Sequence, residues 1–373
     1  MFLAMKELMR NKMRFFMIVI IFVLVSWLVL ILSGLGNGLS TLAAATFKNM
    51  KADYVVFEQG SQSSMSKSLM SDQLVAEVKQ LPNVEDASPM GNTMATALKG
   101  NSTKNEDKVD IAIIGIDPGS FLEPAVVEGK GLSADNLNGI IANATMKDDG
   151  FKLGDTFQLD GTNESLTIIG FVENQTYNHV AAVFAPMAEW RKITFSAPGS
   201  DKGIENPVNA IMLQGKDIDP SVINAKLSNT DTVTRAAAVK GMPGFKEENA
   251  SITMMLAFLL TISAFVLGVF FYVVTMQKTN QFGIMKAIGA KNGFLGRAII
   301  SQVLVLSVMS IAAGILLTYG TAAVIPKAIP FKLDSSLVIN YSIVLLIIAM
   351  LSSLVSVRKM TKIDPLKALG RVE

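Results

Sequence analysis

The sequence has no cysteine, a single histidine (His179) and few charged residues, at 17% of the chain. Without cysteine the chain can form no disulfide, no thiolate metal site and no lipid anchor on cysteine. It also has no Gly-x4-Gly-Lys-Ser/Thr phosphate loop, no His-Glu-x-x-His and no Gly-x-Ser-x-Gly. We therefore expect no enzymatic activity in this chain, no metal site and no permanently bound cofactor.

Charged residues are few because four long apolar runs contain none of them. A soluble domain carries about a quarter charged residues, and a helix needs roughly 20 apolar residues to cross a bilayer. The four runs that approach or exceed this length are 15–32, 251–276, 298–325 and 337–357. The first is longer than the h-region of a cleaved signal peptide, about 7–15 residues, so we interpret it as an anchor. No run contains a charged residue, which argues against a proton- or sodium-driven carrier.

The basic residues lie in the short segments between these runs. Segments 1–14, 277–297 and 358–373 together hold 13 basic and 3 acidic residues, whereas 36–250 holds 18 basic and 27 acidic. Basic segments next to membrane helices stay on the cytoplasmic side. We expect a multi-pass protein of the plasma membrane, with both termini cytoplasmic and the large domain extracellular.

The predicted fold is a membrane protein of four transmembrane α-helices, arranged 1+3, with a large α+β extracytoplasmic domain between the first two. The expected segments are a cytosolic amphipathic helix at 1–14, transmembrane helices at 15–35, 251–276, 298–325 and 337–357, the extracytoplasmic domain at 36–250, a cytosolic segment at 277–297, an outer loop at 326–336 and a cytosolic tail at 358–373.

The large domain mixes strand and helix patterns. Residues 39–50 look helical and extend the first span outward. Alternating apolar residues and turn signals predict strands at 52–58 and 109–116, a helix at 71–78, and a hairpin formed by 151–159 and 166–172 around the turn at 160–163. The alternating short patterns of 182–235 suggest a second lobe.

Small residues at four-residue spacing predict close helix contacts. Gly34 and Gly38 form such a pair at the outer end of the first run, and we expect it to face the second run or a second copy of the chain. Ser310, Gly314, Thr318 and Ala322 share one face of the third run.

Two cytosolic motifs carry a resemblance to a known family. The first is Phe282-Gly283-Ile284-Met285-Lys286-Ala287-Ile288-Gly289-Ala290, directly after the second run, and the second is the tail Arg358–Leu369 with its Lys-Ile-Asp-Pro and Ala-Leu elements. With the start Phe2–Leu8 and the order of the spans, they make the chain resemble the FtsX-like, MacB-type permeases of ABC transporters. The resemblance implies a homodimer in membrane lipid, with a cytosolic ABC ATPase subunit that uses ATP, and no nucleic-acid partner.

The first motif has the features of a docking segment for that ATPase. Apolar side chains would fit a groove on the partner, glycines would end the helix, and Lys286 would make charged contacts; the residues are Phe282, Gly283, Ile284, Met285, Lys286, Ile288 and Gly289. A loop that only kept positive charge inside would not require the apolar members.

Within this family the chain is most similar to the haem-export (HrtB-type) permeases of Gram-positive bacteria. The similarity rests on Phe270–Lys278, on the strand Gly170–Val172 leading to Tyr177-Asn178-His179, and on the Lys-Ile-Asp-Pro ending. It implies export of an amphipathic substrate, with haem as the candidate.

Tyr177 and His179 are then candidate iron ligands, although both also suit an ordinary turn. The slot would be formed by Trp27, Met254, Met255 and Phe258. Two other functions stay open: force transmission to a cell-wall hydrolase, and sensing of or resistance to antimicrobial peptides.

Overall fold

The structure is a computed structural model that describes residues 12–99, 108–326 and 329–361. It divides into a helical unit, from residues up to Gly38 and from Asn249 onward, and a sheet unit, Leu39–Glu248. The division falls within two long helices, α2 (Lys12–Asn49) and α7 (Phe245–Gln277). Most of the predicted helix at 1–14 and of the tail at 358–373 lies outside the described residues.

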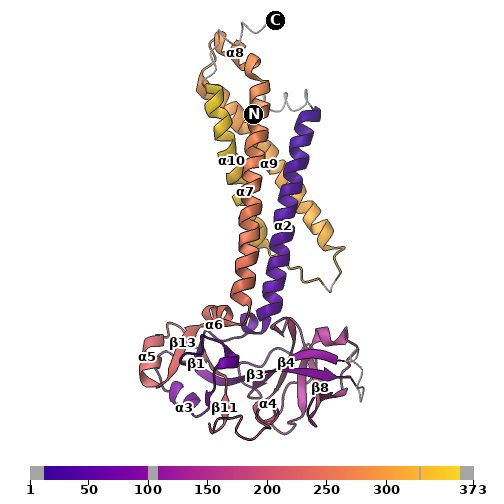
Figure 1. Ribbon diagram of the computed structural model, residues 1–373, viewed down its shortest axis with the longest axis vertical. Helices are drawn as coiled ribbons and strands as arrows, with labels where there is room; N and C mark the ends of the chain where they lie inside the picture. The colour runs from indigo at the N-terminus through magenta and orange to yellow at the C-terminus, as the bar shows by residue number, and fades with distance from the viewer. Residues whose placement is uncertain (1–11, 100–107, 327–328, 362–373) are drawn as a thin grey trace. The chain divides into compact units, whose positions relative to one another are not determined.

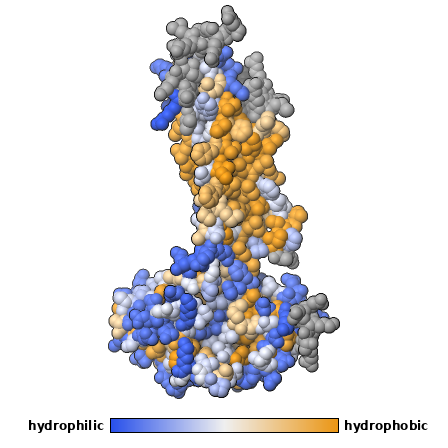
Figure 2. Space-filling view, in the orientation of Figure 1, coloured by the Kyte–Doolittle hydropathy of each residue, from blue (hydrophilic) through white to orange (hydrophobic). Residues whose placement is uncertain are grey.

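Four helices of the described chain are long and apolar enough to cross a membrane: α2, α7, α9 (Asn292–Ala322) and α10 (Ser335–Thr361). They are the four predicted runs, and each is longer than its run; Figure 1 labels all four helices. Figure 2 shows that hydrophobic residues cover most of the visible surface of the helical unit. The shorter α8 (Thr279–Ala287) follows α7 directly.

Small residues bring α2 and α9 together. A Cβ built on Gly314 would lie 2.6 Å from Ser26 Oγ and 3.2 Å from the backbone nitrogen of Trp27, so only glycine fits there. Ser310 Oγ donates a hydrogen bond to Val19 O at 3.4 Å. The predicted small-residue face of the third run therefore packs against the first helix.

The predicted contact between Gly34, Gly38 and the second run is not formed. A Cβ on Gly34 would lie 2.5 Å from the Phe331 ring, and one on Gly38 would lie 2.1 Å from Pro330 O, both in the segment between α9 and α10. Lys332 N–H also donates to Gly34 O at 3.0 Å. The segment 330–332, between α9 and α10, packs against α2 at Gly34 and Gly38 and fills the space that the two glycines leave. Gly36, between them, is the position that meets Ile252 of α7.

The sheet unit is built on one large mixed sheet. Its strands, in the order β13-β1-β12-β3-β4-β10-β6-β8-β5, run antiparallel to their neighbours except for the parallel pairs β10/β4 and β6/β8; β7 pairs with β3 and β8, and β9 with β10. The bounds are β1 Tyr54–Glu58, β3 Asp86–Leu98, β4 Lys108–Ile116, β5 Glu128–Gly129, β6 Gly139–Asn143, β7 Thr156–Leu159, β8 Ser165–Val172, β9 Thr176–Tyr177, β10 Val180–Pro186, β12 Ala210–Gln214 and β13 Thr230–Thr234. A separate pair joins β2 (Met70–Ser71) to β11 (Pro207–Val208).

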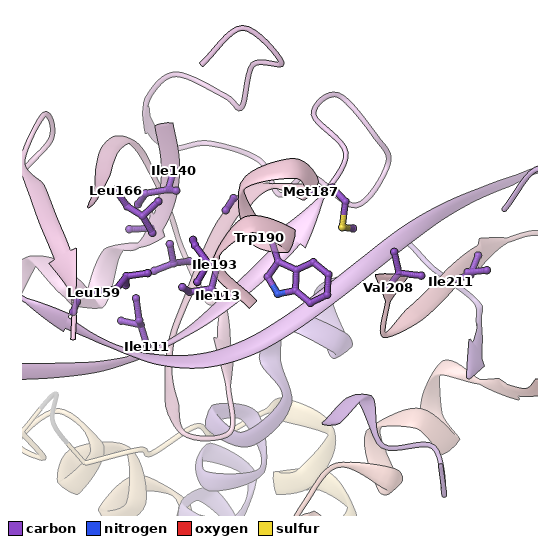
Figure 3. Close-up of a cluster of buried hydrophobic side chains, with 14 of the residues drawn as sticks. Ile111, Ile113, Ile140, Leu159, Leu166, Met187, Trp190, Ile193, Val208 and Ile211 are labelled. Carbon is purple, nitrogen blue, oxygen red and sulfur yellow. The ribbon is translucent and has the colours of Figure 1, made fainter. Parts of the chain in front are cut away.

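Alternation along β4 supplies both cores of this unit, because successive side chains of a strand point to opposite faces. Ile111 and Ile113 belong to the core that contains Trp190, on α4 (Met187–Thr194), whereas Ile114 belongs to the core around Phe47. Figure 3 shows Ile111, Ile113 and Trp190 within the first core. The remaining short elements are η1 (Met65–Lys67), α3 (Leu74–Val78), η3 (Ala144–Lys147), α5 (Pro220–Lys226) and α6 (Arg235–Gly241).

The indole of Trp190 lies on a strand surface without side chains. A Cβ on Gly91 of β3 or Gly115 of β4 would lie 2.3 or 2.5 Å from the indole. Trp190 Nε1 donates to Thr93 Oγ1 at 3.1 Å. The two glycines are thus required by close packing, and Trp190 fills the space with its one polar atom satisfied.

The structure confirms the predicted strands at 52–58 and 109–116, the helix at 71–78 and the hairpin around 160–163, as β1, β4, α3 and β7/β8. The suggested second lobe at 182–235 is wrong. Its strands β10, β12 and β13 pair with β4, β3 and β1 of the same sheet. The long strand β3 was not predicted, because Pro89, Gly91 and several small polar residues hide its alternation.

Candidate functional site

Tyr177 and His179 lie at the tight turn between β9 and β10, Tyr177 just before the turn and His179 within it. Tyr177 pairs with Val180, and the two residues between them, Asn178 and His179, have φ values of 48° and 69°. Two positive φ values in a two-residue hairpin are typical of a type I′ turn. The turn is attached to the end of α2, since Asn178 N–H donates to Ala43 O at 2.8 Å and His179 N–H donates to Leu42 O at 3.3 Å.

The two candidate ligands have different surroundings. Tyr177 is only 4% exposed and packs against Phe47 with ring centroids 6.1 Å apart. Burial raises the pKa of the Tyr177 phenol to about 12, so the phenol stays protonated at neutral pH and could bind ferric iron as tyrosinate only if the iron displaced that proton to water. The imidazole of His179 is 40% exposed, and its Nε2 lies 3.1 Å from Glu248 Oε2.

An apolar groove runs along α7 within its membrane-spanning part. Its volume is about 660 Å³, and residues of α7 and α10 line it: Leu260, Thr261, Ala264, Phe265, Gly268, Val269, Tyr272, Ile348 and Ser352. Ser352 Oγ donates to Ala264 O at 3.1 Å, which joins the two helices at the groove floor. A Cβ on Gly268 would come no closer than 3.9 Å to Ser352 Cβ, so the space above Gly268 is open.

This groove has the size and lining of a small-molecule site. Pockets for drug-sized ligands have volumes of roughly 300–1,000 Å³ and are mostly apolar with a few polar groups. Here the polar groups are the hydroxyls of Thr261, Tyr272 and Ser352. Such a groove can hold a flat apolar body and offer it a few hydrogen-bond partners.

The predicted slot residues lie before the groove or on another helix. Met254, Met255 and Phe258 are more than half exposed on α7, and the groove begins at Leu260. Trp27 is half-buried, and its Nε1 donates to Thr321 Oγ1 of α9 at 3.3 Å. The sequence reasoning missed Ala264 and Gly268, although their four-residue spacing of small residues is the signal that could have found the groove.

The predicted docking segment forms α8 and the turn after it, and its apolar residues divide into two groups. Phe282 and Gly283 are buried, and Phe282 packs with Phe271 of α7 and Ile299 of α9. Ile284 is 50% exposed and Ile288 80%. Phe282 therefore packs inside the helical unit. The prediction that it contacts the ATPase is wrong, because its ring is buried.

The other members of the segment fit a helix that ends before a turn. Met285 and Lys286 are half-buried, and Gly289 has a φ of 98°, the left-handed conformation that ends many helices. At the start of α8, the buried Lys278 donates from Nζ to Gln302 Oε1 of α9 at 3.2 Å. The docking role of the exposed residues stays a prediction.

Comparisons with known proteins cover the whole chain. The family model of the MacB-like periplasmic core domain matches residues 15–239, and that of the FtsX-like permease C-terminal region matches residues 253–365. The extracellular domain of a noncanonic ABC-type transporter, YknZ, from Gram-positive bacteria is similar with 13% identity and a TM-score of 0.35, over 48% of this chain and 98% of that one.

Curated relatives match from end to end. A protein of Staphylococcus haemolyticus that carries the name of a hemin transport system permease, HrtB, is 26% identical over 371 residues, which are 100% of this chain and 99% of the relative. An uncharacterized ABC transporter permease of Mycobacterium tuberculosis is 23% identical over 372 residues, 99% of each chain. Because the MacB-like model alone matches more than half of the sequence, the chain belongs to the MacB-like, FtsX-like family and is an ABC transporter permease.

Proposed function

We propose that the protein is the membrane subunit of a homodimeric exporter that moves an amphipathic substrate, haem, outward, driven by a separate ATPase. The observation that carries the proposal is the open apolar groove of about 660 Å³ between α7 and α10. A substrate that partitions into lipid can reach this groove sideways, without a polar channel. Similarity to relatives named for hemin transport supports haem as the substrate.

Coupling to the ATPase is assigned to the exposed part of the α8 segment. Ile284 and Ile288 present apolar surface in a segment that also carries Lys286 and Lys291 and no acidic residue. Apolar anchors surrounded by charge are typical of a protein interface. We assign this segment and both termini to the cytoplasm on the positive-inside rule. An impermeant maleimide applied to whole cells should label Lys202→Cys and leave Ala287→Cys unlabelled; the reverse pattern would contradict this orientation.

Haem-stimulated ATP hydrolysis by the purified permease–ATPase complex tests the transport proposal. Gly268→Leu places a side chain in the groove and should reduce stimulation about tenfold or more, the effect of a loss of over 1.4 kcal/mol of binding free energy. Gly320→Leu on α9 is the matched control, because a Cβ there has no neighbour within 4 Å. Stimulation that survives Gly268→Leu would remove the groove from the route, and absence of stimulation in the wild type would favour force transmission or peptide resistance.

The iron ligands are tested by the Soret spectrum of the haem-loaded protein. Tyr177→Phe removes the phenol oxygen and keeps the packing against Phe47, whereas His179→Ala removes the imidazole. If either residue binds iron, its variant shifts the Soret band. A double variant with the wild-type spectrum would exclude both and direct attention to Tyr272 in the groove.

A further inference from the structure

The sheet unit contains a polar cleft that the transport proposal does not use. Its volume is about 590 Å³, and it lies where η1, the end of α6, the linker after α6 and the first turn of α7 meet. Polar and charged side chains line it: Gln62, Ser64, Ser66, Lys67, Lys240, Lys246 and Glu247.

The cleft is locally basic in an acidic domain. It contains Lys67, Lys240 and Lys246, from three different elements, against the single carboxylate of Glu247. Segment 36–250 as a whole holds 27 acidic and 18 basic residues, so this excess of lysine is a local feature. Among the described residues, no carboxylate forms an ion pair with these lysines, and the partner of Lys67 is the neutral Gln62 Oε1 at 2.9 Å. A concave surface with charges of one sign concentrates counter-ions.

The wall of the cleft is held by close backbone packing. A Cβ on Gly241, at the end of α6, would lie 2.5 Å from Ser63 O, so only glycine lets α6 approach this loop. Gln62 and Ser63 both have a φ of 58°. Ser64 Oγ and Ser66 Oγ share a hydrogen bond at 3.0 Å, which leaves one hydroxyl hydrogen of the pair as a donor beside the ammonium groups. The arrangement is therefore largely formed before any ligand binds.

The position of Lys246 along α7 points to the ligand. Lys246 precedes Ser251, the first residue of the uncharged run, by five residues of continuous helix. At 1.5 Å per residue this is roughly 7.5 Å, and the headgroup layer on one side of a bilayer is about 5–8 Å thick. Lysine near that layer attracts anionic lipid.

We propose that this cleft binds the phosphate headgroup of an anionic phospholipid of the outer leaflet. Lys67, Lys240 and Lys246 contact the phosphate, and whichever of the Ser64 and Ser66 hydroxyls does not donate to the other donates a hydrogen bond to it. The site is independent of the transported substrate, so it can be present whether or not the protein exports haem.

Lipid retention by the full-length permease tests this site. The permease is reconstituted into nanodiscs of mixed phosphatidylglycerol and phosphatidylcholine, extracted, and analysed by native mass spectrometry. Wild type should retain phosphatidylglycerol preferentially. Each Lys→Gln change at 67, 240 or 246 should weaken that preference about fivefold, and the triple variant about a hundredfold, since each lysine near a membrane surface adds a similar factor. The matched control is the triple variant Lys152→Gln, Lys202→Gln and Lys226→Gln, which removes three exposed charges of the same domain away from the cleft.

Three outcomes decide the proposal. Loss of preference in the cleft triple with retention in the control triple supports it. Equal loss in both triples would show that only the net charge matters and would overturn it. Inorganic phosphate that displaces the lipid at matched concentration would also overturn it, because the ligand would then be a soluble anion. Haem-stimulated ATP hydrolysis, measured in parallel, keeps failure of this site distinct from failure of the transport proposal.

Discussion

Glu189 is a buried carboxylate next to Trp190, the largest fully buried side chain of the described residues. It precedes Trp190 on α4 and is 2% exposed, and its nearest cation is Lys192, with Nζ 3.6 Å from Oε1. Burial raises the pKa of the Glu189 carboxyl, Lys192 opposes the shift, and the charge of Glu164 adds to it. Because the pKa of Glu189 is raised in the folded state, the carboxyl contributes its full stabilisation below its ordinary pKa of 4.5, where it is protonated. This contribution is lost as the pH rises through the raised pKa and the buried carboxyl ionises. At neutral pH Glu189 is therefore a cost to stability.

Glu189→Gln should relieve this cost. We expect the variant to be more stable than wild type by about 1 kcal/mol at pH 7, equivalent to roughly 2–4 °C in Tm. The difference should shrink toward pH 4, where the wild-type carboxyl is protonated. The measurement is Tm against pH by tryptophan fluorescence, in a Trp27→Phe background so that Trp190 is the only reporter. A difference that does not change with pH would show that charge burial is not the cause.

The surroundings of individual residues could be predicted only in part from the sequence. The strand-and-turn pattern correctly indicated a turn after Tyr177, but not that the phenol is buried against Phe47, which is 130 positions earlier. The pairing of His179 with Glu248 joins residues 69 positions apart. Local spacing does not report such pairs, because they depend on how the sheet and the end of α2 pack together.

In the helix α8, the local secondary structure could be predicted from the sequence, whereas the tertiary contacts could not. Its helical character and the glycine at its end could be predicted, since both depend on neighbouring residues. The inward direction of Phe282 could not, because it depends on α7 and α9. In a membrane unit apolar residues occur on every face, so periodicity does not separate a packed face from a lipid- or partner-facing one.

Two substitutions in this segment separate docking from packing. Ile288→Asp should abolish co-purification with the ATPase, because a charge in an apolar groove costs several kcal/mol, and it should leave the Tm of the permease unchanged since Ile288 is 80% exposed. Phe282→Ala should lower the Tm, as removal of a buried phenylalanine costs about 3–5 kcal/mol. Co-purification and thermal stability are measured on both variants. An Ile288→Asp protein that still binds the ATPase would show that α8 is not the docking segment.

Across the whole chain, the features that could be predicted are those carried by continuous segments of the sequence: the four apolar runs, the basic segments between them and the order of the spans. The large mixed sheet could not be predicted, because it joins strands from both ends of the 39–248 segment, as in the pairing of β1 with β13. The groove between α7 and α10 likewise depends on two helices distant in sequence. Membership of the MacB-like, FtsX-like family agrees with the predicted spans and their order, and it does not depend on the sheet or the groove.

The predicted homodimer has a candidate interface on α7. Phe258, Ile262, Phe265 and Val269 are each about 60–70% exposed and follow one another at intervals of four, three and four residues. Phe265 and Val269 also line the groove between α7 and α10, so an interface on this face would border the groove. This spacing is typical of side chains that pack between two helices. Exposed apolar residues also suit lipid, which is as apolar as they are, so exposure alone does not choose between a second copy and the bilayer.

Cysteine cross-linking makes that choice, and the chain offers a background without native cysteine. Ile262→Cys in membranes should form a disulfide-linked dimer on mild oxidation if Ile262, in the middle of this face, lies near the two-fold axis, where the two copies of one residue meet. Leu316→Cys on α9 is the control, since Leu316 is 74% exposed and faces lipid if α7 forms the interface. Cross-linking of Leu316→Cys with none at Ile262→Cys would place the interface on α9, and cross-linking of neither would leave both helices in contact with lipid.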